Sequence, residues 1–170
     1  MLSFLFRGLT AERPDGTALF DALTAEARRP GWYLQGAVPD TLDGRFAVLA
    51  TVTALVLVRL ERESDAGNRM SVALTERFIA VMESEHRELG LGDPTLGKTV
   101  RKLVGMLASR TDLWRSALSD GADSTTAARD SLYKAEPPAG ALEHSAAALR
   151  SMWDRLERAS LVQLEQGLIA

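Results

Sequence analysis

The sequence contains no cysteine and only two histidines. A chain without cysteine forms no disulfide, has no thiol nucleophile and offers no cysteine ligand for zinc. Two histidines leave little material for metal binding or for acid–base catalysis at neutral pH. These absences predict that the protein is not an enzyme and that it carries neither a metal nor another cofactor.

Long hydrophobic runs are also missing. The longest stretch without a charge is Phe46 to Val58, 13 residues, which as a helix would extend about 20 Å, short of the ~30 Å hydrocarbon core of a bilayer. It therefore predicts a buried core helix. Because the start of the chain lacks the pattern of a secretory signal, we expect a cytoplasmic protein. We expect the apolar residues 4–6 to fold onto the domain as an arm, with a membrane or client contact as the alternative.

The length and the composition are those of one ordinary globular domain. The chain has 170 residues, of which 46% are hydrophobic and 25% charged, so we expect a single domain over residues 1–170, working as a monomer. The formal net charge is −3. Because no overall positive field attracts a polyanion, we expect no binding to DNA.

Apolar residues recur at helical spacing along the chain, and the alternating apolar and polar runs typical of strands are missing. The helix that contains Phe46 to Val58 is apolar nearly all round, so we expect it at the centre of the core. The sequence predicts an all-α fold, a single compact domain of about six helices with a long C-terminal helix. The expected helices cover residues 17–29, 43–62, 68–89 and 93–118, a short segment ending near 133, and 139–167.

Residues Gly92 to Thr99 match the phosphate-loop pattern G-x-x-x-x-G-K-[ST]. A working phosphate loop follows a buried strand and opens a helix, whereas this segment follows a helical pattern. Asp93 would bring a carboxylate toward the phosphates, and Pro94 removes one backbone amide. We therefore expect a capped helix start here, and a nucleotide-binding enzyme is the alternative function.

Glu83 and His86 form a Glu-x-x-His step, which places both side chains on one face of a helix. Di-iron helical bundles need two such steps and further carboxylates. The other histidine, His144, has Ala141 three residues before it. We therefore expect a structural or surface histidine at position 86, and a metal-binding helical enzyme is a second alternative.

Residues 94 to 118 carry five basic residues against a single acid. The first three, here called the basic stripe, share one helix face by their i, i+3, i+4 spacing. Such a stripe is either a solvated face or a docking surface for ribosomal RNA, anionic lipid head groups or an acidic partner. The basic residues are Lys98, Arg101, Lys102, Arg110 and Arg115, and the acid is Asp112.

Two stretches of the sequence resemble the ubiquinol–cytochrome c chaperone family. Their blocks follow the order and spacing of the family over about residues 18–118. The first stretch has Ala-Arg-Arg-Pro with an aromatic pair, then Val38 to Phe46 (VPDTLDGRF), then Arg59-Leu60. The second has Phe78, Met82-Glu83, Arg87-Glu88, Gly90 to Asp93, Gly97-Lys98, Val100 to Lys102, and Arg110.

The resemblance implies a non-enzymatic assembly factor. Members of this family are the bacterial relatives of the mitochondrial assembly factor for cytochrome b. They bind newly made cytochrome b and support the biogenesis of respiratory complex III. The resemblance therefore implies cytochrome b as the client, and it is compatible with contacts at the ribosomal tunnel exit and at the inner face of the plasma membrane. It also explains the phosphate-loop pattern as a family block without nucleotide chemistry.

A client chaperone needs a groove and a docking surface, and three groups of residues are our candidates. The aromatic ones would edge a client groove, with burial in the core as the alternative. The charged ones before the central helix would order that loop, through helix capping and an internal ion pair. The basic stripe would face RNA, lipid or client loops. In this order the candidates are Trp32, Tyr33 and Phe46; Asp40, Asp43 and Arg45; Lys98, Arg101 and Lys102.

Overall fold

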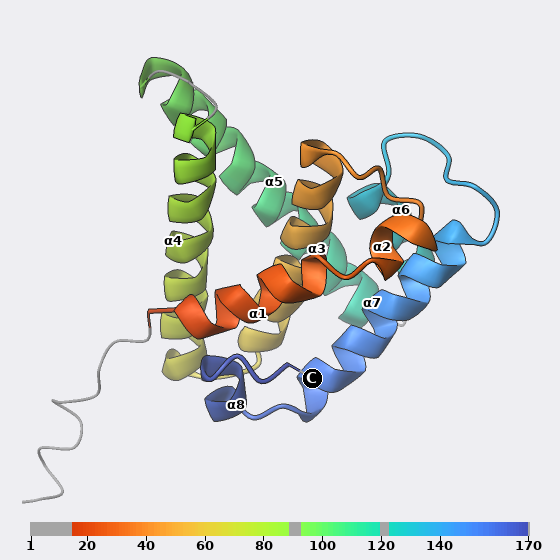
Figure 1. The fold of residues 1–170 in the computed structure, drawn as a ribbon. Helices are drawn as coiled ribbons and strands as arrows, with labels where there is room; N and C mark the ends of the chain where they lie inside the picture. Colours follow the sequence, from red (N-terminus) through yellow and green to blue (C-terminus); the bar gives the residue numbers. More distant parts are fainter. Residues whose placement is uncertain (1–14, 89–92, 120–122, 170) are drawn as a thin grey trace, which may run out of the picture.

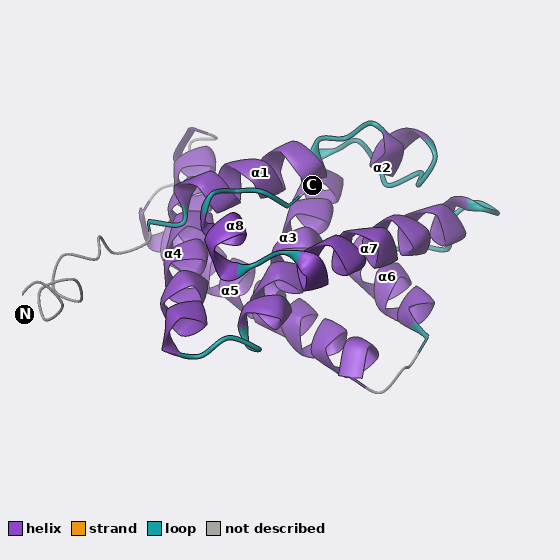
Figure 2. Ribbon diagram, turned by 90° about the horizontal axis from the view of Figure 1, so that it is seen from below, coloured by secondary structure: helices purple, strands orange, loops and turns teal. Residues whose placement is uncertain are grey.

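The computed structural model describes residues 15–88, 93–119 and 123–169, and within these ranges it consists of helices and loops without a strand (Figure 1, Figure 2). The predicted all-α class is confirmed. The apolar arm expected at residues 4–6 lies outside the described residues. The helices are α1 (Thr17–Ala27), α2 (Gly31–Leu34), α3 (Leu42–Leu60), α4 (Asp65–Glu88), α5 (Asp93–Ser119), α6 (Ser124–Leu132), α7 (Ala141–Arg158) and α8 (Leu161–Glu165).

Helix α3 is the central helix, as its apolar sequence predicts. It packs against α1, α4, α5, α6 and α7, and α1 crosses in front of it in Figure 1. Side chains on several of its faces, among them Leu55, Val56 and Leu60, are fully buried. Each such side chain stabilises the fold by about 1.5–3 kcal/mol when it leaves water. The other helices are therefore positioned by their contacts with α3.

Aromatic side chains connect the helices around α3. Phe78 of α4 is fully buried and meets Phe20 of α1 edge-on, with ring centres 6.4 Å apart. On its other side Phe78 lies 6.0 Å from the ring of Phe46 on α3. Trp114 of α5 is also buried, and its indole N–H donates to Ser131 Oγ of α6 over 3.0 Å. These contacts hold α1, α4, α5 and α6 in place relative to the first turns of α3.

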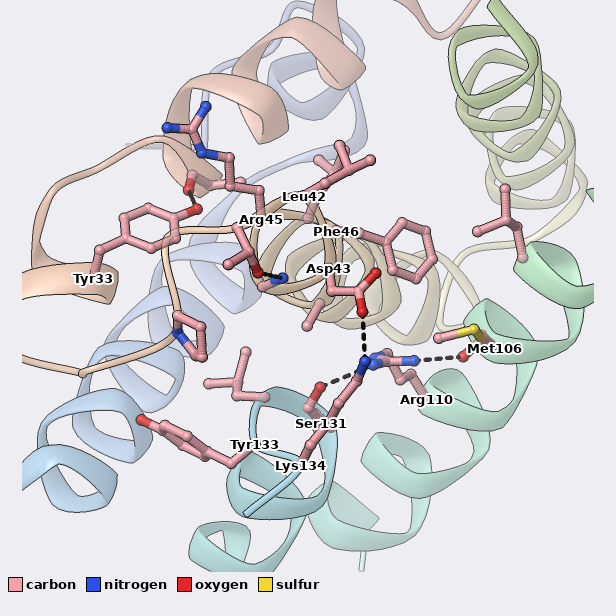
Figure 3. Close-up of a pocket in the computed structure, with 18 of the residues that line it drawn as sticks. Tyr33, Leu42, Asp43, Arg45, Phe46, Met106, Arg110, Ser131, Tyr133 and Lys134 are labelled. Atoms are coloured by element: carbon pink, nitrogen blue, oxygen red, sulfur yellow. Dashed lines mark hydrogen bonds and ion pairs between the residues drawn. The ribbon is translucent and has the colours of Figure 1, made fainter. Parts of the chain in front are cut away.

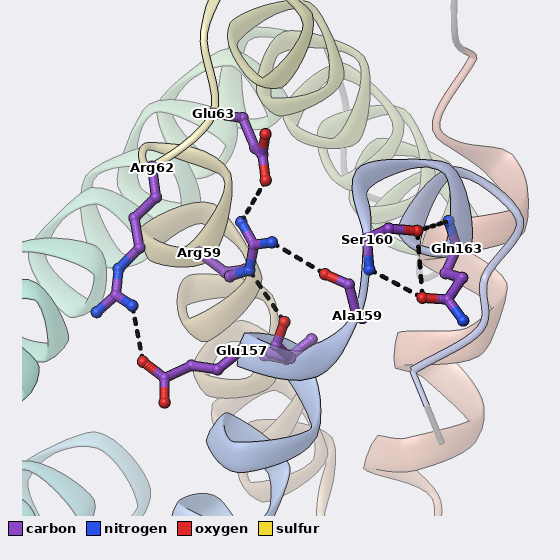
Figure 4. Close-up of polar contacts among 8 residues, drawn as sticks. Arg59, Arg62, Glu63, Glu157, Ala159, Ser160 and Gln163 are labelled. Atoms are coloured by element: carbon purple, nitrogen blue, oxygen red, sulfur yellow. Dashed lines mark hydrogen bonds and ion pairs between the residues drawn. The ribbon is translucent and has the colours of Figure 1, made fainter.

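The predicted continuous helix over residues 139–167 is wrong, because the chain breaks it into α7 and α8. Ala159 adopts an extended conformation with ψ of 134°. Ser160 then caps α8 by a capping box with Gln163, shown in Figure 4, in which each side chain bonds the other's backbone N–H. The guanidinium of Arg59 donates to the carbonyl oxygen of Ala159 over 2.9 Å. The spacing of four and three residues continues from Leu156 to Ser160 and Gln163, so the spacing alone gave no sign of the break.

No helix within the described ranges is both long enough and apolar enough to cross a membrane. Helix α3 contains the longest run without a charge, and its apolar surface is covered by the neighbouring helices.

Candidate functional site

A cleft of about 1030 Å³ lies at the amino end of α3 (Figure 3). Its walls are the end of α1, the first turns of α3 with the segment before them, the second half of α4, the first two-thirds of α5, and the end of α6 with the loop toward α7. This volume is at the upper end of that of small-molecule sites. The cleft therefore has room for a segment of polypeptide.

The loop before α3 is held in one conformation by the residues that follow it. Thr41 caps α3, and its Oγ1 accepts a hydrogen bond from the backbone N–H of Gly44 over 3.2 Å. A Cβ at position 44 would lie only 1.9 Å from the carbonyl oxygen of Pro39. The loop therefore approaches α3 as closely as a glycine allows. This approach points Leu42 and Phe46 toward the cleft, as Figure 3 shows.

Most of the exposed surface of the lining is apolar, although ten of the side chains that line the cleft are charged. Leu42 at the start of α3 is 56% exposed. The half-buried ring of Phe46 lies deeper, and Leu103 and Met106 of α5 line the same cleft. An open apolar surface of this kind is typical of sites that bind a partner.

Two ion pairs flank this apolar lining. Asp43 accepts from Lys134 Nζ over 2.5 Å, an exposed contact that joins α3 to the loop after α6. The ammonium group of Lys134 lowers the pKa of the Asp43 carboxyl below its usual range, with a further contribution from Lys102. Asp40 pairs with Arg45 over 2.6 Å, and this guanidinium lowers the pKa of Asp40. Asp43, Arg45 and Lys102 line the cleft, whereas Asp40 does not.

The two predicted aromatic residues before α3 lie in different places. Trp32 is 3% exposed, lies outside the cleft lining, and donates its indole N–H to the carbonyl oxygen of Glu26 over 2.9 Å. Its ring therefore belongs to the protein's own core. Tyr33 lines the cleft, and its hydroxyl donates to the carbonyl oxygen of Ala27 over 2.7 Å. Partial burial raises the pKa of this hydroxyl.

Tyr133 was not identified as a candidate from the sequence. Its hydroxyl joins the loop at Gly36 to α7 at one end of the cleft. Its hydroxyl donates to the carbonyl oxygen of Gly36 over 2.5 Å and lies 2.7 Å from Ser145 Oγ of α7. Partial burial raises the pKa of the Tyr133 hydroxyl. A Cβ on Gly36 would come within 2.5 Å of that serine oxygen, so the loop fits closely against α7. Tyr133 and Gly36 are 97 positions apart in the chain, so only the tertiary structure reveals this role of Tyr133.

Arg110 projects from α5 into the cleft lining (Figure 3). Its terminal nitrogens donate to the backbone carbonyl oxygens of Met106, over 3.2 Å, and Ser131, over 2.9 Å. Its Nε is buried and has no hydrogen-bond partner. The guanidinium carbon lies 6.0 Å from the centre of the Phe46 ring, within range of a cation–π interaction. Burial lowers the pKa of Arg110.

The basic residues of α5 separate into three groups. Lys98 and Arg101 are exposed and lie outside the cleft lining, whereas Lys102 is exposed on its edge. Arg110 lies in the cleft, as described above. Arg115 forms ion pairs with Glu61, over 2.6 Å, and with Asp112, and both carboxylates raise its pKa. The structure therefore places only part of the basic surface beside the cleft.

The segment that resembles a phosphate loop is helical from Asp93 onward, because α5 begins there. A phosphate loop wraps its backbone amides around the ligand before the helix starts, and the described part of this segment does not have that conformation. Gly92 lies outside the described residues, as does the side chain of His86. No group of three or more histidine, aspartate or glutamate residues that could hold a metal occurs in the part of the chain that the structure describes.

The fold and the cleft define a helical protein with a cleft large enough for a segment of polypeptide. A family model described as ubiquinol-cytochrome C chaperone matches residues 35–168, and the chain belongs to this family. The match continues through α7 and α8, beyond the region in which the sequence resemblance was found.

One solved structure extends the comparison to the fold. The crystal structure of the Cbp3 homolog from Brucella abortus is similar to this chain with a TM-score of 0.78 and 27% sequence identity. The similarity covers 98% of this chain and 94% of that chain. No curated protein sequence matches the chain.

Proposed function

We propose that this protein is an assembly chaperone that binds newly made cytochrome b and supports the biogenesis of ubiquinol–cytochrome c reductase, respiratory complex III. It acts by binding, without a catalytic step and without a cofactor. The observation that carries the proposal is the wide apolar cleft in a member of the ubiquinol–cytochrome c chaperone family.

The lining of the cleft suits a segment of an unassembled membrane protein. Such a segment is apolar along most of its length and ends in polar residues near the membrane surface. The exposed Leu42 and the ring of Phe46 would shield its apolar part. The Asp43–Lys134 pair on the rim would contact its polar end. A helix lying in this cleft would follow the helix-in-groove mode of peptide recognition.

The basic stripe is the docking surface in this proposal. Lys98, Arg101 and Lys102 are exposed on α5, and Lys102 also borders the cleft. A single-domain monomer held by this stripe at the ribosomal tunnel exit, or at the inner face of the plasma membrane, would have its cleft beside the emerging client. The protein therefore works on the cytoplasmic side of the membrane, as a peripheral protein.

Deletion in the native host tests the function. We expect lower levels of cytochrome b and of assembled complex III, restored by the wild-type protein. We expect tagged protein to capture newly made cytochrome b. A deletion strain with normal complex III, together with no capture of cytochrome b, would contradict the proposal.

A variant with Lys98→Glu, Arg101→Glu and Lys102→Glu tests the stripe separately. Because the three side chains are exposed, the fold should not change, and we expect complex III to fall toward the level of the deletion strain. Unchanged capture and unchanged complex III would show that the stripe is only a solvated face. The matched control is Arg129→Glu, an exposed site on α6 outside the cleft lining.

A further inference from the structure

Arg110 is a charged group whose surroundings do not neutralise it. The described residues offer its guanidinium two backbone carbonyl oxygens, those of Met106 and Ser131, and they form no ion pair with it. The Nε–H group is buried without a partner. An arginine withdrawn from water without a carboxylate is costly, because neutral oxygens compensate only part of its lost hydration.

The carboxylates of α3 and α6 that line the cleft are already paired with other cations. Asp43 pairs with Lys134, and Asp130 contacts Arg129. The remaining carboxylates in the lining come from the end of α4 and from the loop toward α7, and none of them forms an ion pair with Arg110; they are Glu85, Glu88 and Glu136. The wall of the cleft thus contains an arginine with which none of the lining carboxylates forms an ion pair. An anion that pairs with this arginine would come from a bound partner.

We propose that Arg110 is the specificity-determining residue of the cleft and that it binds a carboxylate, the side chain of an aspartate or glutamate carried by an otherwise apolar segment of the client polypeptide. The ring of Phe46 beside the guanidinium and the apolar side chains of α5 contact the rest of that segment. This inference rests on the proposed function, because it names the feature by which the client is recognised.

Apolar client segments with a carboxylate and those without one would bind to the cleft with different affinities. A purely apolar segment in the cleft would displace the remaining water from Arg110 without offering a hydrogen-bond acceptor in its place. The cost of this desolvation would weaken the binding of the segment. A segment with a carboxylate at this point would form charge-assisted hydrogen bonds with the terminal nitrogens, which are roughly twice as strong as neutral ones. Arg110 therefore selects apolar segments that carry an acid over apolar segments that do not.

The test uses the full-length protein and synthetic peptides that cover the loops and helix ends of cytochrome b from the same organism, with affinity measured by fluorescence anisotropy. Each peptide that binds is also made with its acids replaced by amides. We expect the acidic form to bind the wild-type protein at least about tenfold more tightly than the amide form. We expect Arg110→Gln to bind both forms equally.

Two further variants separate charge from structure. Arg110→Lys keeps the charge but loses the planar donor fork, so it should recover only part of the preference for the acidic peptide. Arg158→Gln, at an exposed site at the end of α7 and outside the cleft lining, should retain the full preference. Circular dichroism reports whether Arg110→Gln folds. If it does not fold, Arg110→Lys decides the question, because a full preference for the acidic peptide in that variant would overturn the role of the Arg110 donor fork.

The outcomes distinguish this inference from the function on which it rests. Peptides that bind the wild-type protein with no preference for the acid would overturn the role of Arg110 and leave the chaperone function standing. The same holds for a preference that persists in a folded Arg110→Gln variant. If no cytochrome b peptide binds the wild-type protein, both the client proposal and this inference are wrong.

Discussion

Arg59 of α3 donates a hydrogen bond from Nε to the carbonyl oxygen of Leu156 on α7 over 2.9 Å, although the two residues are 97 positions apart in the chain. The same guanidinium donates to the carbonyl oxygen of Ala159 and pairs with Glu63 over 2.8 Å, as Figure 4 shows. Since the last carbonyl groups of a helix have no partner within the helix, Arg59 supplies the donors that close the end of α7.

Replacing Arg59 with methionine should therefore destabilise the protein. The variant leaves buried carbonyl oxygens without donors, and we expect a loss of about 3 kcal/mol, or a fall in Tm of roughly 6–12 °C for a domain of this size. Thermal unfolding followed by circular dichroism measures it. The control is Arg129→Gln, which breaks the exposed Arg129–Asp130 pair and should cost less than about 1 kcal/mol. Equal losses in the two variants would contradict the role of Arg59.

Gly44 should not tolerate alanine. The added methyl group would lie 1.9 Å from the carbonyl oxygen of Pro39, so the loop that forms one wall of the cleft would have to move. We expect Gly44→Ala to lose about 1–3 kcal/mol in urea unfolding and to capture less cytochrome b. Gly105→Ala is the matched control, because a Cβ there meets nothing within 4 Å, and it should gain up to about 1 kcal/mol from helix propensity. A Gly44→Ala variant as stable as the wild type would show that the close approach is unimportant.

The Asp43–Lys134 pair should respond to acid. Lys134 lowers the pKa of Asp43 in the folded protein, so the pair favours the fold above the ordinary aspartate pKa of about 3.9. That contribution is lost as the pH falls through the lower folded-state value. We expect NMR titration to show a lower pKa for Asp43 in the wild type than in Lys134→Gln. Asp40, which pairs with Arg45, should titrate alike in both proteins. An unchanged Asp43 titration in Lys134→Gln would mean that the pair does not persist in solution.

Nucleotide should not stabilise the protein. Because the described residues of the phosphate-loop pattern are helical, we expect no change in Tm with Mg-ATP. A site filled at 100 times its Kd would raise the stability by about 2.7 kcal/mol. The same thermal-shift screen with iron and zinc tests the Glu83 and His86 alternative. A concentration-dependent rise in Tm with any of these ligands would restore the enzyme hypothesis for that ligand.

Helix positions were largely predictable because the signals are local. The start of α1 at Thr17, the central place of α3 and the helix start at Asp93 follow from capping residues and from apolar spacing within a few turns. The break at Ala159 was missed, although Ser160 and Gln163 form a capping-box pattern that is visible in the sequence. Only the donors from Arg59, on a distant helix, required the tertiary structure.

The candidate site was predictable only in part. Phe46 was expected to edge a client groove, Asp43 to order the loop before α3 and Lys102 to belong to the basic stripe, and all three line the cleft. Trp32 was expected there as well, yet its ring is buried in the core. Tyr133 had no local signal, since its partner oxygen belongs to Gly36, far away in the chain.

By itself the sequence determined that this chain is helical, that the helix with the longest run without a charge is central, and that it resembles one chaperone family, because composition, periodicity and local motifs carry that information. Only the tertiary structure decided which charges are paired and which are not. On one helix, Arg115 is neutralised by Glu61, 54 positions away, while Arg110 faces the cleft without a carboxylate partner among the described residues. Ion pairing depends on distances in space, and the distances are set when the helices pack.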